Sequence, residues 1–234
     1  MRNVGMFVIF MMVSFASAQF KTGIFLYEEK QGEGTLVHEL KIDDTYFVAT
    51  VYQKNPAKFI KTQGGFYTVD GNKLKVKLEF NSNFQEDSVK ELAYSFTQNN
   101  KELKLEASTA KRYKKSSESP KDLNGKWIIT GRGGQSFDKA EVFKKPRKTM
   151  KFLLNGHFQW IAFNSDTFQF SGTGGGTYET KDGTYIEKIA YFSRDDSRVG
   201  AALDFKYEIK NGDWHHSGKS SKGVDIYEVW SIRE

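Results

Sequence analysis

Two stretches of this sequence follow the same pattern 111 positions apart: LAYSFTQNNKEL at residues 92–103 and LDFKYEIKNGDW at residues 203–214. Apolar residues fall on apolar residues in this alignment. At the same offset, GGFY at 64–67 falls on GGTY at 175–178. Matches that keep their order along the chain indicate a duplicated structural unit, so the sequence predicts two tandem copies of one domain.

The alignment of the copies changes by one position elsewhere. One added residue places the DG pair at 70–71 on the DG pair at 182–183, and the segment 42–48 corresponds to 154–160. The matches therefore extend over nearly the whole length of each half.

A polar segment, SSESPK at 116–121, has the composition of an exposed linker. It separates a first domain at 19–115 from a second at 122–234. Each domain has the ordinary size of an independently folding unit.

Each copy contains short stretches rich in Phe, Tyr, Val and Ile, with period-two alternation and Asn-Gly or Asp-Gly pairs between them. This pattern is typical of antiparallel strands joined by tight turns. The strands expected in the second copy are 126–130, 149–154, 157–163, 167–171, 176–180, 184–193, 203–210 with 214–217, and 226–232. A closed sheet has no exposed edges, so the pattern predicts an all-β protein of two tandem antiparallel meander β-barrels.

The glycine run GTGGG at 172–176 could suggest a phosphate-binding loop. Such a loop needs a helix after it, whereas here the sequence continues as a strand. We expect a bend or bulge at this point of the barrel.

The composition excludes several classes of protein. There are 20 Phe, 11 Tyr and 4 Trp among 234 residues and no Cys. So much aromatic surface can form a core, which excludes a disordered chain. The lack of Cys excludes a disulfide scaffold, thiolate catalysis and a Cys-ligated metal site.

The first eighteen residues predict a secretory signal peptide. Arg2 precedes the apolar run at 6–13, and Ala16-Ser17-Ala18 is the small-x-small pattern of a cleavage site. The run is too short for a membrane span, and no later stretch is suitable for one. We therefore expect a secreted or periplasmic protein, cleaved near Ala18.

Charge and histidine positions argue against nucleic-acid and metal partners. The net charge of +6 is spread over both halves, whereas a nucleic-acid binder concentrates its basic residues on one face. The four histidines are His38, His157, His215 and His216. The adjacent pair would point to opposite faces of a strand, so we expect solvent-facing histidines and no metal site.

Three residues of the second copy carry a resemblance to a known family. Gly125 and Trp127 open its first strand, and Arg233 ends its last. With FSGTGGGTY at 170–178 and Glu187 downstream, the second copy resembles lipocalin-like (calycin superfamily) secreted proteins of uncharacterised function found in Bacteroidetes.

The resemblance implies a barrel that is closed by the guanidinium of Arg233 packing on the indole of Trp127. A planar cation stacks on Trp with about 0.5–2 kcal/mol of attraction. It also implies a barrel that can hold a small apolar or amphipathic ligand. No cofactor is implied.

The first copy departs from this pattern. Gly23-Ile-Phe25 replaces Gly-x-Trp, Lys75 stands where the second copy has Glu187, and only Lys111-Arg112 loosely corresponds to Arg233. We expect one working copy and one scaffold.

Candidate ligand-binding residues follow from strand alternation in the second copy. Tyr185 and Glu187 share one strand face, Glu228 shares a face of the last strand with Trp230, and Phe158 and Trp160 share a third face. If these faces point into the barrel, both carboxyl groups lie inside an aromatic cavity. Tyr178 and Glu187 are the expected polar anchors, since a desolvated carboxyl group has a raised pKa and binds cationic or hydroxylated groups. The alternatives are that Glu187 and Glu228 each pair with a nearby Lys or Arg, or that one of them faces solvent.

Three functions remain open. The first is an exported, non-enzymatic protein that binds a small apolar or amphipathic ligand in its second barrel. The second is a structural or protein-interaction module with filled barrels and no ligand. The third is a carboxylate-dependent hydrolase or isomerase that uses Glu187, although no nucleophile motif is present.

Overall fold

The computed structural model describes residues 20–116 and 121–233. The expected signal peptide at 1–18 lies outside the described residues, as does most of the expected linker. In the described part, no helix has the length and apolar character needed to cross a bilayer.

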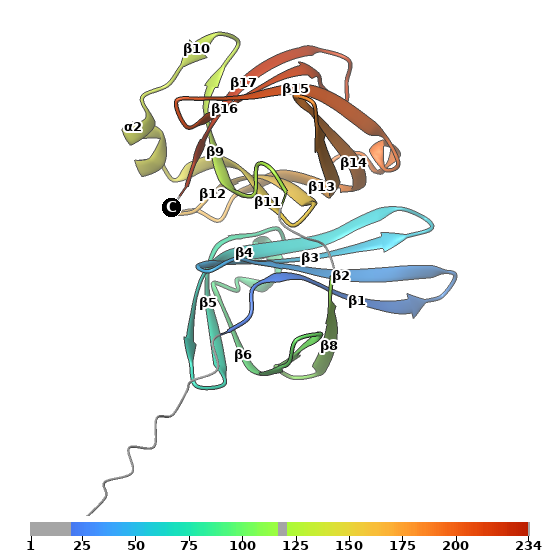
Figure 1. Ribbon diagram of the computed structural model, residues 1–234. Helices are drawn as coiled ribbons and strands as arrows, with labels where there is room; N and C mark the ends of the chain where they lie inside the picture. Colours follow the sequence, from blue (N-terminus) through green and yellow to red (C-terminus); the bar gives the residue numbers. More distant parts are fainter. Residues whose placement is uncertain (1–19, 117–120, 234) are drawn as a thin grey trace, which may run out of the picture.

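The chain forms two closed eight-stranded antiparallel barrels, which confirms the expected fold class (Figure 1). The strands of the first barrel are β1 (Gly23–Gln31), β2 (Gly34–Ile42), β3 (Tyr46–Lys54), β4 (Lys58–Asp70), β5 (Lys73–Asn81), β6 (Glu91–Gln98), β7 (Glu102–Glu106) and β8 (Ala110–Lys115). The strands of the second are β9 (Gly125–Arg132), β11 (Arg147–Leu154), β12 (His157–Asn164), β13 (Phe170–Lys181), β14 (Thr184–Phe192), β15 (Ala202–Lys210), β16 (Asp213–Lys219) and β17 (Asp225–Ile232).

Three short helical elements and a two-residue strand complete the chain. They are α1 (Phe84–Asp87), α2 (Lys139–Lys144), the 3-10 turn η1 (Asp196–Arg198) and β10 (Gln135–Ser136). Strand β10 extends the sheet beyond β9. Each barrel closes by pairing its first strand with its last, β1 with β8 and β9 with β17.

Strand β5 illustrates why these sequences form strands. Leu74, Val76 and Leu78 are buried, while the three lysines that alternate with them are exposed. A period of two places one set inside the barrel and the other in water.

Both barrels have a β-bulge at matching glycines. The register shifts between Gly64 and Gly65 in β4 and between Gly175 and Gly176 in β13. A Cβ on Gly65 or on Gly176 would lie 2.0 Å from a backbone carbonyl oxygen of the neighbouring strand. The expected bulge is confirmed, and the two strands expected at 167–171 and 176–180 are one bulged strand.

Strand register corrects part of the expected alignment. Tyr67 pairs with Val76 in the first barrel, as Tyr178 pairs with Glu187 in the second. The offset therefore stays at 111, and Val76, not Lys75, is the counterpart of Glu187. The Asp-Gly match was misleading because both hairpins have two-residue turns that favour the same residue types.

The interior of the first barrel is filled with apolar side chains. Its buried cluster consists of Phe20, Phe25, Leu40, Ile42, Phe47, Leu74, Val76, Leu78, Phe96, Leu103, Leu105 and Tyr113. At one end of this barrel, Glu29 accepts hydrogen bonds from Tyr27 and Lys111 and contacts His38 at 2.8 Å. This barrel is a packed core.

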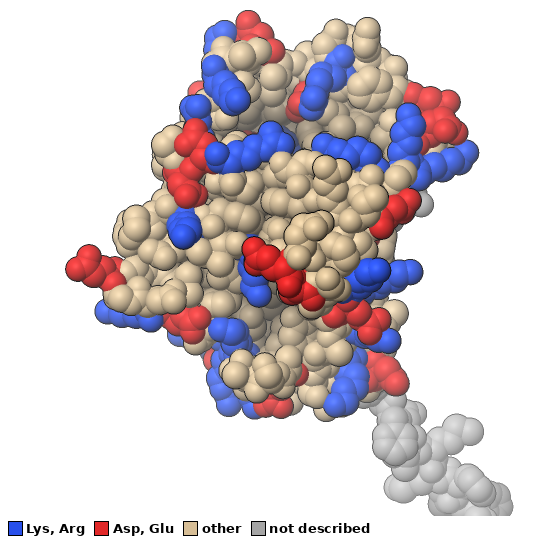
Figure 2. Space-filling view, turned by 180° about the vertical axis from the view of Figure 1, so that it is seen from behind, with Lys and Arg blue, Asp and Glu red and all other residues tan. Residues whose placement is uncertain are grey.

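The outer faces of the two barrels pack against each other, β2–β4 of the first on β11–β14 of the second (Figure 1). Part of this interface is apolar: Tyr46, Val48 and Phe80 contact side chains of the second barrel. The surface seen from behind in Figure 2 has acidic and basic side chains interspersed across both barrels.

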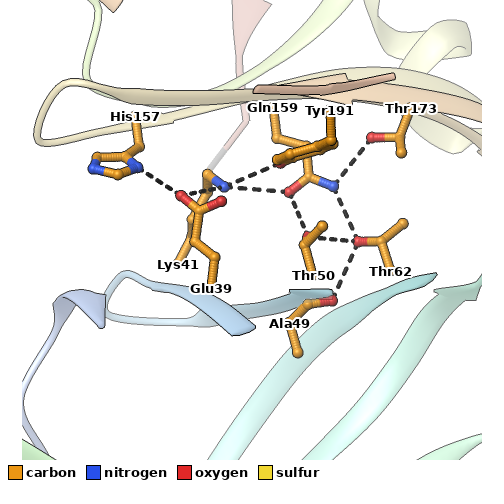
Figure 3. A network of polar contacts seen from close by, with 9 residues as sticks. All are labelled: Glu39, Lys41, Ala49, Thr50, Thr62, His157, Gln159, Thr173 and Tyr191. Atoms are coloured by element: carbon orange, nitrogen blue, oxygen red, sulfur yellow. Dashed lines mark hydrogen bonds and ion pairs between the residues drawn. The ribbon is translucent and has the colours of Figure 1, made fainter. Parts of the chain in front are cut away.

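The rest of the interface is a buried polar network, shown in Figure 3. Nδ1 of His157 lies 2.6 Å from Oε1 of Glu39, and Nζ of Lys41 lies 3.0 Å from the same oxygen. Burial would raise the pKa of Glu39, but these two neighbours lower it to about 2. Gln159 accepts a hydrogen bond from Thr50 at 3.0 Å and donates one to Thr62 at 3.0 Å.

Arg233 belongs to this interface and does not close the second barrel. Its guanidinium forms two hydrogen bonds to Glu79 of the first barrel, at 2.7 and 2.8 Å, and lies 5.0 Å from the ring centroid of Phe66. The indole of Trp127 instead donates to the carbonyl of Leu123 at 2.8 Å, inside the second barrel.

The expected stack of Arg233 on Trp127 is therefore wrong. Closure still occurs where it was expected, because Ile232 pairs with Trp127 and β9 begins at Gly125. The backbone holds the last strand, since the amide of Arg233 donates to the carbonyl of Lys126 at 2.6 Å. A side chain at the end of a strand can point away from its barrel. Here the first barrel places the carboxylate of Glu79 within hydrogen-bonding distance of Arg233.

Candidate ligand cavity in the second barrel

The second barrel contains a cavity of about 330 Å³ that opens to solvent at one end. Strand residues alternate between the two faces of the sheet, so every second residue points into the barrel, and a subset of these inward residues lines the cavity. Aromatic walls come from Phe158, Trp160, Phe192, Phe205 and Trp230. The size is that of a site for a small molecule.

The floor of the cavity holds a buried ion pair. Nζ of Lys151 on β11 lies 2.8 Å from Oε1 of Glu187 on β14, and both side chains are less than one-tenth exposed. The hydroxyl of Tyr185 donates to the same oxygen at 3.0 Å. Burial and the adjacent carboxylate raise the pKa of Tyr185, so its hydroxyl stays protonated as a donor.

Four aromatic rings surround the ammonium group of Lys151. Its Nζ lies 5.0 Å from the ring centroid of Trp214, 5.1 Å from Tyr185, 5.4 Å from Trp230 and 5.7 Å from Phe205. Each ring face attracts a cation. These rings thus already surround a cation, the ammonium group of Lys151.

His216 on β16 also lines the cavity and is almost fully buried. Neither of its ring nitrogens meets a hydrogen-bond partner among the described residues, and the same holds for the indole nitrogen of Trp230. Burial, helped by the charge of Lys151, lowers the pKa of His216 to about 4, so the imidazole is neutral at neutral pH.

Glu228 lies near the solvent end. It contacts Arg132 at 3.1 Å, and its Oε2 lies 3.5 Å from Nδ1 of His216. Burial would raise the pKa of Glu228, but His216, Lys151 and Arg132 lower it overall, and the group stays ionised.

Four of the six residues expected to bind a ligand line the cavity: Phe158, Trp160, Glu187 and Glu228. Tyr185 is not among the lining residues, but its hydroxyl group donates a hydrogen bond to Glu187, which is. Tyr178 lies elsewhere, at the closed end of the barrel, where its hydroxyl hydrogen-bonds to Asp122 and Asn124.

Pairing also changes the expected role of the carboxylates. Glu187 is neutralised by Lys151 and Glu228 by Arg132, as in the alternative considered from the sequence. A paired, multiply hydrogen-bonded carboxylate is a poor anchor for a cation.

Sequence reasoning missed Lys151, His216 and the arginines at the cavity opening. Lys151 shares the inward face of β11 with Leu153, but Met150 and Phe152 on the other face are equally buried, against the first barrel. The alternation therefore favoured Met150 and Phe152 as the inward residues, because the face that lines the cavity carries Arg147, Thr149 and Lys151. At a constant offset of 111, Lys151 aligns with Leu40, which belongs to the apolar core of the first barrel. This difference between the copies would have singled out Lys151.

The expectation of solvent-facing histidines holds for only part of the set. His215 contacts Tyr227 on the outside of the second barrel, whereas His216 is inside it and His157 is in the interface. Adjacent strand residues do point to opposite faces, but one of those faces is the cavity. Among the described residues, no group of three or more His, Asp and Glu side chains could hold a metal ion.

No protein-family model matches this chain, and no curated protein matches its sequence.

Proposed function

We propose that this protein binds a small amphipathic molecule in its second barrel, as an exported lipocalin-like carrier, and that the first barrel is its scaffold. One observation supports this most directly. Two residues that line the cavity, His216 and Trp230, have buried ring nitrogens without a close hydrogen bond among the described residues, and Nδ1 of His216 has only a 3.5 Å contact with Glu228.

Such groups are costly when left without partners. A buried polar group without a hydrogen bond costs about 1–3 kcal/mol, and most buried polar atoms in proteins have a partner. A ligand with a hydroxyl or carbonyl oxygen near His216 and Trp230 would provide one. The aromatic walls would contact the apolar part of the same molecule.

The paired state of Glu187 favours binding over catalysis. A general base needs a carboxylate that can accept the substrate's proton, whereas Glu187 already accepts from Lys151 and Tyr185. In this proposal the Lys151–Glu187 ion pair is a structural part of the cavity floor.

Native mass spectrometry tests the proposal directly. Protein purified without denaturation from the cells or medium that produce it should show an additional mass, lost on unfolding. Ala162 lines the cavity, and Ala162→Phe should fill the space and remove the additional mass. Ala93→Phe, on the outer face of β6, is the matched control and should keep it. A spectrum of the bare chain, together with no binding of fluorescent apolar probes, would reject the proposal.

A further inference from the structure

The charges around the cavity do not balance. Four cationic side chains line it, Lys151, Arg132, Arg147 and Arg194, against the two carboxylates of Glu187 and Glu228. Each carboxylate already has a cationic partner, Lys151 at 2.8 Å and Arg132 at 3.1 Å.

Arg147 and Arg194 are the surplus. Within residues 20–116 and 121–233, neither forms an ion pair with a carboxylate; both donate to backbone carbonyls. Arg194 donates through Nε and Nη2 to the carbonyl of Ser171, at 2.9 and 2.6 Å. Arg147 donates to the carbonyls of Lys148 and Phe163. A guanidinium has five N–H donors, so each retains donors for another group.

The wall between these arginines is built from small residues. Thr149, Ala162 and Gly172 lie in one row across β11, β12 and β13, since Thr149 pairs with Ala162 and Ala162 with Gly172. A Cβ on Gly172 would lie 2.6 Å from Nε of Arg194. The glycine therefore lets the guanidinium of Arg194 lie against the wall. There, Cζ of Arg194 is 6.0 Å from the ring centroid of Trp160.

We propose that the cavity selects an organic anion, whose carboxylate group lies between Arg147 and Arg194 while its apolar body extends inward along Trp160 and Phe158. This deepens the proposed function and rests on it. Guanidinium groups bind planar carboxylates through charge-assisted hydrogen bonds. A cationic ligand is disfavoured at both ends, by the arginines at the opening and by Lys151 within its aromatic rings.

Three probes with one naphthalene body test the charge selectivity: 2-naphthylacetate, 2-(2-naphthyl)ethanol and 2-(2-naphthyl)ethylammonium. Titration calorimetry on the full mature chain should give the acetate a dissociation constant at least about tenfold below that of the alcohol, and the ammonium the weakest binding. Equal affinity for the three would overturn the anion selectivity and leave the proposed cavity function intact. Binding of none of them would reject this site for ligands of that size, and the selectivity with it.

Two variants locate the selectivity. Arg147→Gln and Arg194→Gln should each weaken acetate binding about tenfold and leave alcohol binding unchanged. Arg112→Gln removes the same charge from an exposed position on β8 of the first barrel and should change neither affinity. Equal weakening by Arg112→Gln would show that net charge, rather than the two arginines at the opening, sets the preference, and would overturn the assignment.

Discussion

The two barrels share one topology and, through most of their strands, one register, but their interiors are chemically different. At the positions where the second barrel has Lys151, Glu187 and His216, the first has Leu40, Val76 and Leu105. The first interior is apolar and packed apart from the cluster of Glu29, His38 and Lys111 at one end, while the second holds a buried ion pair, a buried histidine and a cavity. The comparison shows that one fold supplies either a core or a site, depending on a few inward positions.

Exchanging the ion pair for its apolar counterparts gives the largest expected effect. Glu187→Val alone leaves Lys151 buried without its partner and should lower the free energy of unfolding by about 3–5 kcal/mol. The double variant Lys151→Leu with Glu187→Val should be close to the wild type or more stable, since apolar replacement of a buried pair is often neutral. Urea denaturation measures both.

The double variant also provides the control for that experiment. If the stability changes of the two single substitutions added up to that of the double variant, Lys151 and Glu187 would not be coupled. The exchange of the pair for Leu40 and Val76 would then not explain a difference in stability between the barrels.

The second effect concerns pH. His216 has a folded-state pKa of about 4, below its ordinary value of 6.5, so the unfolded chain binds the proton more readily. The stability should therefore be unaffected above pH 6.5 and fall by about 3 kcal/mol as the pH drops from 6.5 to 4. The variant His216→Leu, which copies Leu105, should lose this part of the pH dependence. Identical stability curves for both proteins from pH 7 to 4 would contradict the prediction.

A smaller effect is expected at the interface. A double-mutant cycle of Arg233→Ala with Glu79→Ala should give a coupling energy of about 1–3 kcal/mol, because the pair is largely buried and doubly hydrogen-bonded. The corresponding cycle with Trp127→Phe should give less than about 0.5 kcal/mol. A larger coupling energy between Arg233 and Trp127 would support the stack of these two side chains that the sequence predicted.

The smallest effect tests the register. Lys75 is exposed and forms a surface ion pair with Glu91 at 3.1 Å, so Lys75→Gln should change the stability by less than about 1 kcal/mol. Val76→Gln, one position on, buries an amide in the apolar core and should cost several-fold more. Thermal unfolding of the two variants compares them, and equal costs would argue against Val76 as the inward counterpart of Glu187.

Much of the architecture could be predicted from the sequence because its signals are local. Strand alternation, two-residue turns and the repeated Gly-Gly pair depend on neighbouring residues, and they led to two closed barrels with a bulge at the glycines. Four cavity-lining residues followed from the same alternation. The role given to Tyr178 stays a prediction, although its hydroxyl group lies at the closed end of the barrel.

Partners across the sheet and across the interface required the tertiary structure. Glu187 meets Lys151 from a strand 36 residues away, and Arg233 meets Glu79 from a position 154 residues away. A local pattern tells which residues share a strand face, but not which charge from another strand or barrel will meet them.

By itself, the sequence determined that this chain folds as two related β-barrels, since the period of its apolar residues and the chemistry of its turns are properties of neighbouring residues. Only the tertiary structure decided that one barrel is packed and the other hollow. The volume left inside a closed sheet depends on how all eight strands place their inward side chains together. Which face of a strand points inward depends in turn on which apolar faces are covered by the neighbouring barrel.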